Sequence, residues 1–180
     1  MKKIKKFDID QMICYFKETN NTEMFRDSYY QLISISEKIC IKIPNTFYLA
    51  SDTYIKNRYF SINRPKKVWI EDLYNVNCIF YPIEKDNQEL ESVLKDAKQE
   101  IMLGYNKVVF YDIQKIVTAD IESMWFDFKS YAESEMVYNL IFFADIEDQR
   151  ILGIFNCRFA LYTVWREIVI YMIKSITLIQ

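Results

Sequence analysis

The sequence predicts an α+β fold, an α/β/α sandwich around a central antiparallel sheet, with an N-terminal helical extension. Short apolar segments with strand alternation follow one another across short polar turns, which favours antiparallel pairing of about six or seven strands. Two amphipathic helical patterns lie in the middle of the chain and at its end. The stretch from Met136 to Ile179 shows two apolar strands and then a helix. We expect residues 1–30 to form the extension and residues 31–180 the folded domain.

The length and composition indicate one domain with a large core. The chain has 180 residues, of which 51% are hydrophobic and 17% aromatic. A chain of this size buries roughly 70% of its unfolded surface, and we expect most rings in the core or in cross-strand pairs. Four cysteines without CxxC spacing, Cys14, Cys40, Cys78 and Cys157, are expected to be buried thiols of a reducing compartment, with a structural disulfide as the open alternative.

Histidine and glycine are too rare for common catalytic and cofactor sites. The chain has no histidine, which removes Ser-His-Asp and Cys-His systems and every zinc site that uses histidine. Its two glycines, Gly104 and Gly153, are isolated, so neither a phosphate-binding loop nor a dinucleotide fingerprint can be formed. We therefore expect no catalytic, cofactor-binding or metal-binding residues and no enzymatic activity.

Charge and hydropathy limit the kinds of partner. A net charge of −2 argues against nucleic-acid binding, which needs a basic excess or patch. No segment approaches the roughly 18 apolar residues of a membrane span. The lysines at the N-terminus are followed by Asp8 and Asp10, where a leader peptide needs an apolar core. We expect a cytoplasmic protein with neither a nucleic-acid nor a membrane partner.

A short helix is predicted near the N-terminus. Asp8 can cap it, and Ile9, Met12, Ile13 and Phe16 follow at helical spacing. This helix forms the expected extension, which we place against the main domain.

Strand-like alternation recurs along the rest of the chain. Pro44 and Pro82 are expected to end two strands, because proline cannot continue a hydrogen-bonded ladder. Residues 124–128 alternate so regularly that we expect a strand buried on one side. Extended segments are expected at 32–35, 39–43, 68–70, 76–81, 108–111, 113–118, 124–128, 137–144 and 151–157.

The segment 46–63 is aromatic but has no regular period. Its rings, such as Tyr54 and Phe60, stand beside Lys56 and Arg58. Rings beside cations are typical of single-stranded nucleic-acid platforms, whereas a loop that covers one sheet face has the same composition. The net negative charge of the chain favours the loop.

Two amphipathic helices are expected to cover the sheet. Asp86 and Glu89 have the spacing of a capping box before the first helix, and Gly104 is expected to end it in a left-handed conformation. The apolar face of the first helix comprises Leu90, Val93, Leu94, Ala97 and Ile101. The apolar face of the second comprises Trp165, Ile168, Val169, Met172, Ile173 and Ile176.

Acidic residues gather near turns without the pattern of a metal or catalytic site. The segment 145–148 lacks the glycine and the ligand spacing of a calcium loop, so we expect a solvated hairpin turn. The remaining acids would make acid–base pairs only if they faced each other across a cleft; we expect surface charges at strand ends. The carboxylates concerned are Asp120, Glu122, Glu133, Glu135, Asp145, Glu147 and Asp148.

The order of aromatic and turn residues resembles one known superfamily. The segments are NRYF (57–60), NRPK (63–66), VW (68–69), VNCIF (76–80), WFDF (125–128), VYNL and FF (137–143), FNC (155–157), and Trp165 followed by MIKSI (172–176). From about residue 39 to residue 176 this order resembles small bacterial members of the Mog/PsbP/DcrB-like superfamily. The resemblance implies an α/β/α sandwich around an antiparallel sheet.

Members of this superfamily mostly bind proteins. Their partners include a nuclear-transport GTPase, photosystem subunits and effectors of bacterial secretion systems, and several small bacterial members resemble immunity proteins or adaptor chaperones. The resemblance therefore implies a non-enzymatic protein-binding protein, most specifically an immunity protein that neutralises a bacterial toxin by direct binding. The alternatives are an adaptor chaperone for a secreted effector and a small hydrolase with paired carboxylates. Toxins that cut nucleic acid are usually basic, so acidic side chains would steer the encounter.

Overall fold

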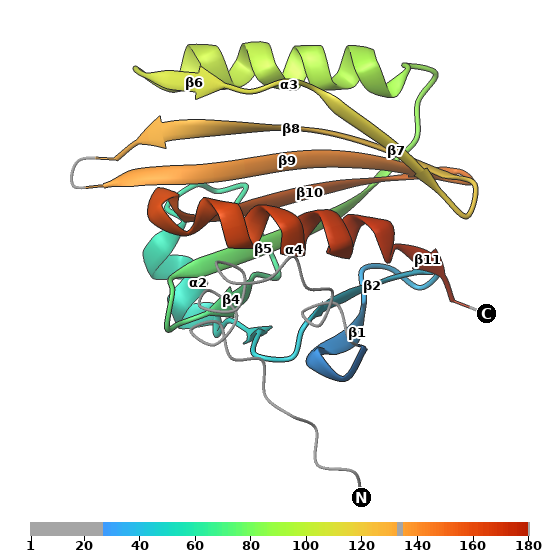
Figure 1. Cartoon of the computed structure of the whole chain (residues 1–180), viewed down its shortest axis with the longest axis horizontal. Coiled ribbons are helices and arrows are strands. Elements are labelled where there is room, and N and C mark those ends of the chain that lie inside the picture. The colour runs from blue at the N-terminus through green and yellow to red at the C-terminus, as the bar shows by residue number, and fades with distance from the viewer. Residues whose placement is uncertain (1–26, 133–134, 180) are drawn as a thin grey trace, which may run out of the picture.

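The computed structural model describes residues 27–132 and 135–179 (Figure 1). The strands are β1 (Tyr30–Ser34), β2 (Ile39–Pro44), β3 (Tyr48–Leu49), β4 (Trp69–Glu71), β5 (Val76–Glu84), β6 (Val108–Phe110), β7 (Gln114–Thr118), β8 (Ile121–Tyr131), β9 (Met136–Ile146), β10 (Gln149–Arg158) and β11 (Thr177–Leu178). The helices are α2 (Asp52–Arg58), α3 (Leu90–Gly104) and α4 (Tyr162–Lys174), with short 3-10 helices at Asp27–Tyr29 and Phe159–Leu161.

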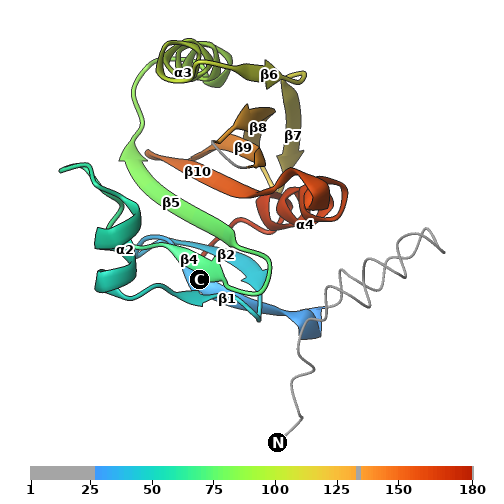
Figure 2. The same ribbon diagram turned by 90° about the vertical axis from the view of Figure 1, so that its left-hand side faces the viewer.

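Two antiparallel sheets form the framework. The main sheet has eight strands in the order β3-β4-β5-β10-β9-β8-β6, and β7 also pairs with β8. A second sheet has three strands in the order β1-β2-β11. Helices α3 and α4 lie on opposite faces of the main sheet, as Figure 2 shows from the side. The fold is thus α+β with an α/β/α sandwich, which confirms the class predicted from the sequence.

The core divides into clusters that correspond to these layers. Between α3 and the sheet, Leu90 and Leu94 contact Phe126, Phe128 and Phe143. On the other face, α4 and the small sheet form a larger cluster whose buried members include Ile39, Ile41, Ile43, Phe155, Trp165 and Met172. A third, smaller cluster joins α2 to β4 and β5 through Ala50, Ile55, Val68, Ile70 and Ile79.

Strand β8 is buried on both faces, so the prediction of a one-sided strand is wrong. Phe126 and Phe128 face α3, as the alternation predicts. Trp125 on the opposite face is also buried, in the cluster that contains α4. Asp127 is buried there as well, where it accepts hydrogen bonds from Tyr138 and Arg166. A polar residue is expected at the surface from sequence alone, but here two distant side chains donate to one of its carboxylate oxygens, Oδ2, inside the core.

The segment 46–63 contains a helix and is not an irregular loop. Ser51 caps α2, because its side chain accepts a hydrogen bond from the backbone N–H of Tyr54. Only Ile55 of this helix is buried. A seven-residue helix with one buried position has no apolar period to detect.

Three predicted element ends also differ from the structure. Strand β5 continues through Pro82, which is tolerated because β4 pairs only with residues 76–78 and leaves that edge open. Helix α3 has Glu89 as its N-cap without a side-chain hydrogen bond, so the capping box is absent. Gly104 is the last residue of α3 and its φ is not positive, so the left-handed end is absent too.

The other main elements agree with the sequence. Pro44 is the last residue of β2, and α4 buries the apolar face predicted for the last helix. The two-residue strands β3 and β11 are too short for alternation to reveal. The predicted N-terminal helix lies outside the described residues, which begin with a short 3-10 helix before β1.

A substitution at Gly153 tests how tightly the centre of the main sheet is packed. It lies opposite Phe142 in the β9–β10 ladder, and a methyl group at residue 153 would overlap the Phe142 ring. We expect Gly153→Ala to lower the free energy of unfolding by about 1–3 kcal/mol, because the core cannot absorb the added volume without strain. Urea denaturation followed by circular dichroism measures the loss.

Gly104→Ala is the matched control. No atom lies near the position of its added methyl group, and alanine favours a helix over glycine by about 0.5–1 kcal/mol. We expect this variant to be neutral or stabilised. Equal losses for the two variants would contradict the packing described here.

Candidate functional site

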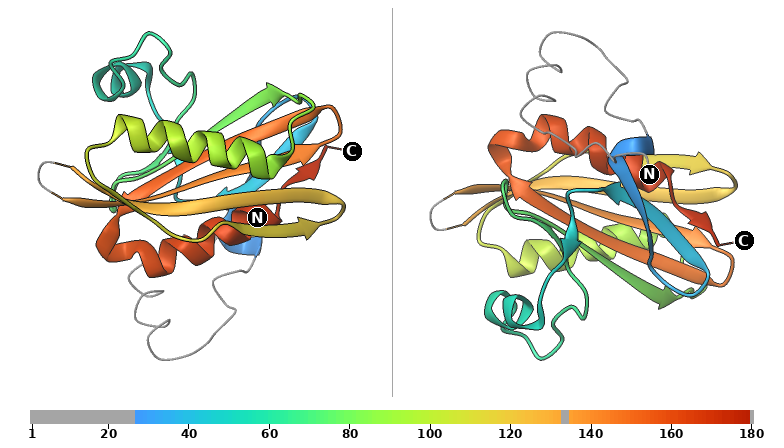
Figure 3. Two further views of the ribbon diagram at one scale, coloured as in Figure 1. Left: turned by 90° about the horizontal axis from the view of Figure 1, so that it is seen from above. Right: turned by 90° about the horizontal axis from the view of Figure 1, so that it is seen from below.

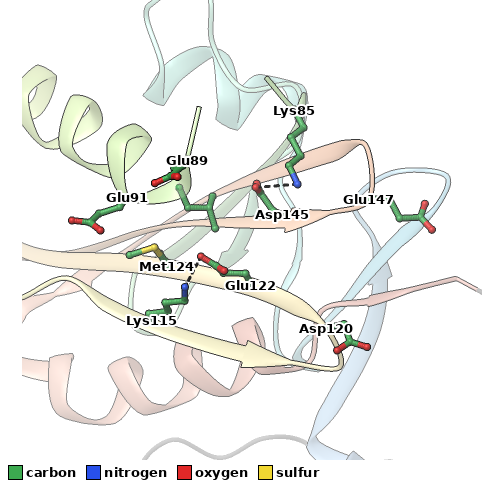
Figure 4. A pocket seen from close by; sticks show the side chains of 10 residues that line it. Lys85, Glu89, Glu91, Lys115, Asp120, Glu122, Met124, Asp145 and Glu147 are labelled. Atoms are coloured by element: carbon green, nitrogen blue, oxygen red, sulfur yellow. Dashed lines mark ion pairs between the residues drawn. The ribbon is translucent and has the colours of Figure 1, made fainter. Parts of the chain in front are cut away.

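An acidic hollow opens at one end of the main sheet, where two hairpin turns and the start of α3 meet (Figure 4). We call it the acidic mouth, and its volume is about 640 Å³. Its lining residues are Lys85, Glu89, Leu90, Glu91, Lys115, Asp120, Glu122, Met124, Asp145 and Glu147. Six of these carry carboxylates and two carry ammonium groups, which gives the lining four more negative than positive charges.

Tight turns place the outer carboxylates. Ala119 and Asp120 connect β7 to β8, and both have positive φ values, of 47° and 66°. This is the pattern of the two-residue turn that matches the twist of a hairpin. Glu147, with φ of 51°, begins the equally short turn between β9 and β10. Both hairpins end at the mouth, so Asp120 and Glu147 stand on its rim.

The sheet register places further charges side by side. Glu122 lies opposite Asp145 in the β8–β9 ladder, and Asp145 lies opposite Arg150 in the β9–β10 ladder. Two carboxylates directly opposite each other are destabilising. Each is compensated by a lysine: Lys115 Nζ lies 2.8 Å from Glu122 Oε1, and Lys85 Nζ lies 3.3 Å from Asp145 Oδ2.

Arg150 holds the inner wall of the mouth together. Its side chain is 2% exposed, and Nε and Nη2 donate to the two oxygens of Asp145 at 2.6 and 3.1 Å. Nη1 donates to Asp86 Oδ1 at 3.0 Å, and Nη2 donates to the carbonyl of Gln88 at 2.7 Å. Hydrogen bonding to Asp145 raises the pKa of Arg150. The guanidinium thus fixes the connection before α3 against the β9–β10 hairpin.

Other carboxylates of the mouth remain available to a partner. Within the described part of the chain, Glu89, Asp120 and Glu147 form no ion pair. Glu91 pairs with Lys95 at 2.7 Å, and the hydrogen bond from this lysine lowers the pKa of Glu91. The residues with assigned positions contain no group of three or more side chains arranged to hold a metal ion. The geometry therefore suits recognition of a basic surface.

The structure changes the interpretation of several acids. Asp145 was expected in a solvated turn, but it lies in β9 with a largely buried side chain because Arg150 binds it. Glu147 and Asp148 do form the predicted turn. Glu135 is paired with Arg158 at 3.3 Å, away from the mouth. Glu133 lies outside the described residues.

The cysteines behave as buried thiols. Cys40, Cys78 and Cys157 are buried and form no disulfide among the described residues. Burial raises the pKa of both Cys78 and Cys157, so neither is an activated nucleophile. Cys14 lies outside the described residues.

A second buried polar cluster fastens α4 to the sheet. Asp127 Oδ2 accepts hydrogen bonds from Tyr138 Oη and from Arg166 Nε, both at 2.8 Å. Burial raises the pKa of Tyr138, which keeps its phenol protonated as a donor. This cluster joins β8, β9 and α4.

The buried charge of Arg150 gives a testable prediction. Arg150→Met leaves the largely buried carboxylate of Asp145 without its main partner, and removal of one member of a buried ion pair costs about 3–5 kcal/mol. We expect a loss of that size in the free energy of unfolding, measured by urea denaturation. Adding Asp145→Leu to this variant should restore much of the stability, because no unpaired charge is then buried.

The control is Arg158→Met. Arg158 pairs with Glu135 at the surface, where an ion pair contributes about 0–1 kcal/mol. A loss no larger for Arg150→Met than for this control would show that Arg150 does not hold the wall of the mouth.

Solved structures match this fold, although no family model and no curated protein matches the sequence. Cyanobacterial PsbP (CyanoP) from Synechocystis sp. PCC 6803 matches with a TM-score of 0.59 and 10% identity, over 84% of this chain and 93% of that chain. LpqN, involved in cell envelope biogenesis of Mycobacterium tuberculosis, matches with a TM-score of 0.56 and 8% identity, over 94% of this chain and 97% of that chain. PA94, a protein of unknown function from Pseudomonas aeruginosa, matches with a TM-score of 0.50 and 7% identity, over 82% of this chain and 95% of that chain. The chain therefore has the fold of PsbP-like proteins, as the order of its aromatic and turn residues predicts.

Proposed function

We propose that this protein is a non-enzymatic, cytoplasmic binding protein of bacterial origin that neutralises a toxin by direct contact, as an immunity protein does. The main observation in support of this proposal is the acidic mouth. Its rim holds Glu89, Asp120 and Glu147, which form no ion pair within the described part of the chain. Such a surface attracts a basic partner over long range and raises the rate of association.

The chemistry of the partner follows from the charge of the mouth. An enzyme that cuts nucleic acid needs cationic side chains to bind phosphates. Carboxylates on short hairpins can occupy that cationic surface and exclude the nucleic acid. The tight turns that hold Asp120 and Glu147 limit the entropy lost on binding, because the carboxylates are already in place.

The ion pairs at the mouth support binding over proton transfer. Glu122 and Asp145 are the two carboxylates directly opposite each other, and each contacts a lysine. Each of these carboxylates is therefore already engaged by a neighbouring cation, whereas a general acid needs a carboxyl group that is free to face the substrate. A hydrolase with paired carboxylates is therefore the weaker proposal.

A second candidate function has its own supporting observation. The small sheet bears a groove of about 430 Å³ lined by Leu32, Ser34, Cys40, Thr177, Leu178 and Ile179. Leu32 is 62% exposed. An adaptor chaperone that carries an apolar segment of an effector would need a groove of this kind.

Co-expression with the toxin encoded beside this gene tests the first proposal. We expect protection of the cells and a copurifying complex. Neutralising the rim with E89Q, D120N and E147Q should weaken the complex by on the order of 10- to 100-fold, mainly by slowing association. The effect should shrink at high salt, because exposed charges are screened. Surface plasmon resonance separates the two rate constants.

The matched control neutralises three exposed carboxylates away from the mouth, with D52N, E100Q and D112N. It changes the net charge equally, and we expect little change in association. No protection together with no complex would overturn the immunity proposal. An equal effect of both triple variants would assign the attraction to net charge and not to the mouth.

The adaptor proposal predicts a different result. Leu32→Glu places a charge in the apolar groove while leaving the acidic mouth intact. We expect it to abolish binding of a fluorescent apolar effector peptide, measured by anisotropy, if the groove receives such a segment. Unchanged peptide binding in this variant would overturn the adaptor proposal.

A further inference from the structure

Helix α2 and the segment that follows it project from the body of the molecule (Figure 3). We call residues 52–67 the basic lobe. Phe60 and Ile62 are 86% and 96% exposed, so two large apolar side chains stand in water here. A folded chain does not gain stability from such exposure, which is typical of a contact surface.

Positively charged residues are concentrated in the same segment of the chain as these two side chains. The lobe contains Lys56, Arg58, Arg64, Lys66 and Lys67, and no acidic residue occurs between positions 53 and 70. None of the five cations takes part in an ion pair with any residue whose position is described. This concentration of positive charge occurs in a chain whose net charge is −2.

The lobe has a defined structure. Ile55 anchors α2 in the small apolar cluster against β4 and β5. A turn follows, in which the N–H of Asn63 donates to Ser61 Oγ at 3.1 Å and the N–H of Arg64 donates to the carbonyl of Ser61 at 3.2 Å. The turn holds Ile62 away from the cluster, so its exposure is built into the fold.

A small hollow lies between α2 and this turn. Its volume is about 290 Å³, and its lining comprises Asp52, Ile55, Lys56, Arg64, Pro65 and Lys66. Three cations thus border it against one carboxylate, which suits an anionic group of phosphate size.

We propose that the basic lobe docks peripherally on an anionic lipid membrane. Phe60 and Ile62 enter the boundary between headgroups and acyl chains, and the five cations contact lipid phosphates. The hollow beside Lys56, Arg64 and Lys66 receives a headgroup phosphate. No helix in the described part of the chain is long and apolar enough to cross a bilayer. A peripheral contact needs no such helix, so this proposal revises the expectation that the protein has no membrane partner.

The chemistry of the lobe favours lipid over other anions. A single-stranded nucleic acid would use Phe60 for stacking, but the aliphatic side chain of Ile62 offers no ring for a base. A projecting apolar tip suits a soft interface, whereas a protein partner would need a complementary pocket. The acidic mouth and α2 lie toward opposite ends of the molecule (Figure 1). An anionic surface therefore attracts the lobe and repels the mouth, which favours one orientation.

Vesicle flotation with the full chain tests the proposal. One vesicle is phosphatidylcholine alone, and the other contains about one third phosphatidylglycerol, which supplies the negative surface potential. We expect binding to the anionic vesicles only, weakening as salt is raised. Phe60→Ser with Ile62→Ser should reduce binding at least tenfold, since each loses its apolar area at the interface. Lys66→Gln with Lys67→Gln should reduce it about fivefold per charge.

Matched controls replace similar side chains elsewhere. Leu73→Ser with Leu103→Ser removes two exposed apolar side chains outside the lobe, and Lys107→Gln with Lys174→Gln removes two exposed charges. We expect both controls to bind as the unaltered protein does. The midpoint temperature of thermal unfolding should be unchanged in the lobe variants, because the altered side chains are exposed. Absence of binding to anionic vesicles, an equal loss in the controls, or binding only to inorganic phosphate or to a single-stranded oligonucleotide would overturn the proposal.

Discussion

The buried guanidinium of Arg150 is the interaction on which the rest of the structure depends. It joins two parts of the chain that are far apart in sequence, the β9–β10 hairpin through Asp145 and the connection before α3 through Asp86 and Gln88. A buried cation is tolerated only when its donors are satisfied, and here each nitrogen of the guanidinium has an acceptor. These contacts hold the connection immediately before α3. They also fix the inner wall of the acidic mouth, so the fold and the candidate site share one constraint.

Helices occupy both faces of the main sheet, so the two candidate contact surfaces lie toward the ends of the molecule. Helix α3 covers one face through its apolar residues, and α4 covers the other, where Arg166 bonds to the buried Asp127. The exposed parts include hairpin turns at one end and α2 with its following turn toward the other. These two exposed parts carry opposite charge. Negative charge is concentrated at the hairpin turns and the start of α3, and positive charge is concentrated in the segment that contains the exposed Phe60 and Ile62.

The sequence predicted the fold where a pattern is repeated, and failed where a contact depends on distant residues. Alternation identified β8, continuous apolar runs identified β9 and β10, and helical spacing identified α3 and α4. Helix α2 was missed because one buried residue makes no pattern. Asp86 was assigned to a capping box, since its true partner, Arg150, is 64 residues away. The mouth was missed for the same reason: the sheet register brings Glu122 beside Asp145, and a single sequence does not contain that register.

The separation of charge between the two ends relates the two proposals to each other. A protein held at an anionic surface through its basic lobe would keep its acidic mouth turned toward solution, because the same surface repels the carboxylates. A basic partner is itself drawn to an anionic membrane, so both would be concentrated in the same thin layer. Confinement of this kind raises the encounter rate without any additional contact between the two proteins. Under the two proposals, the lobe would select the place of encounter and the mouth would select the partner.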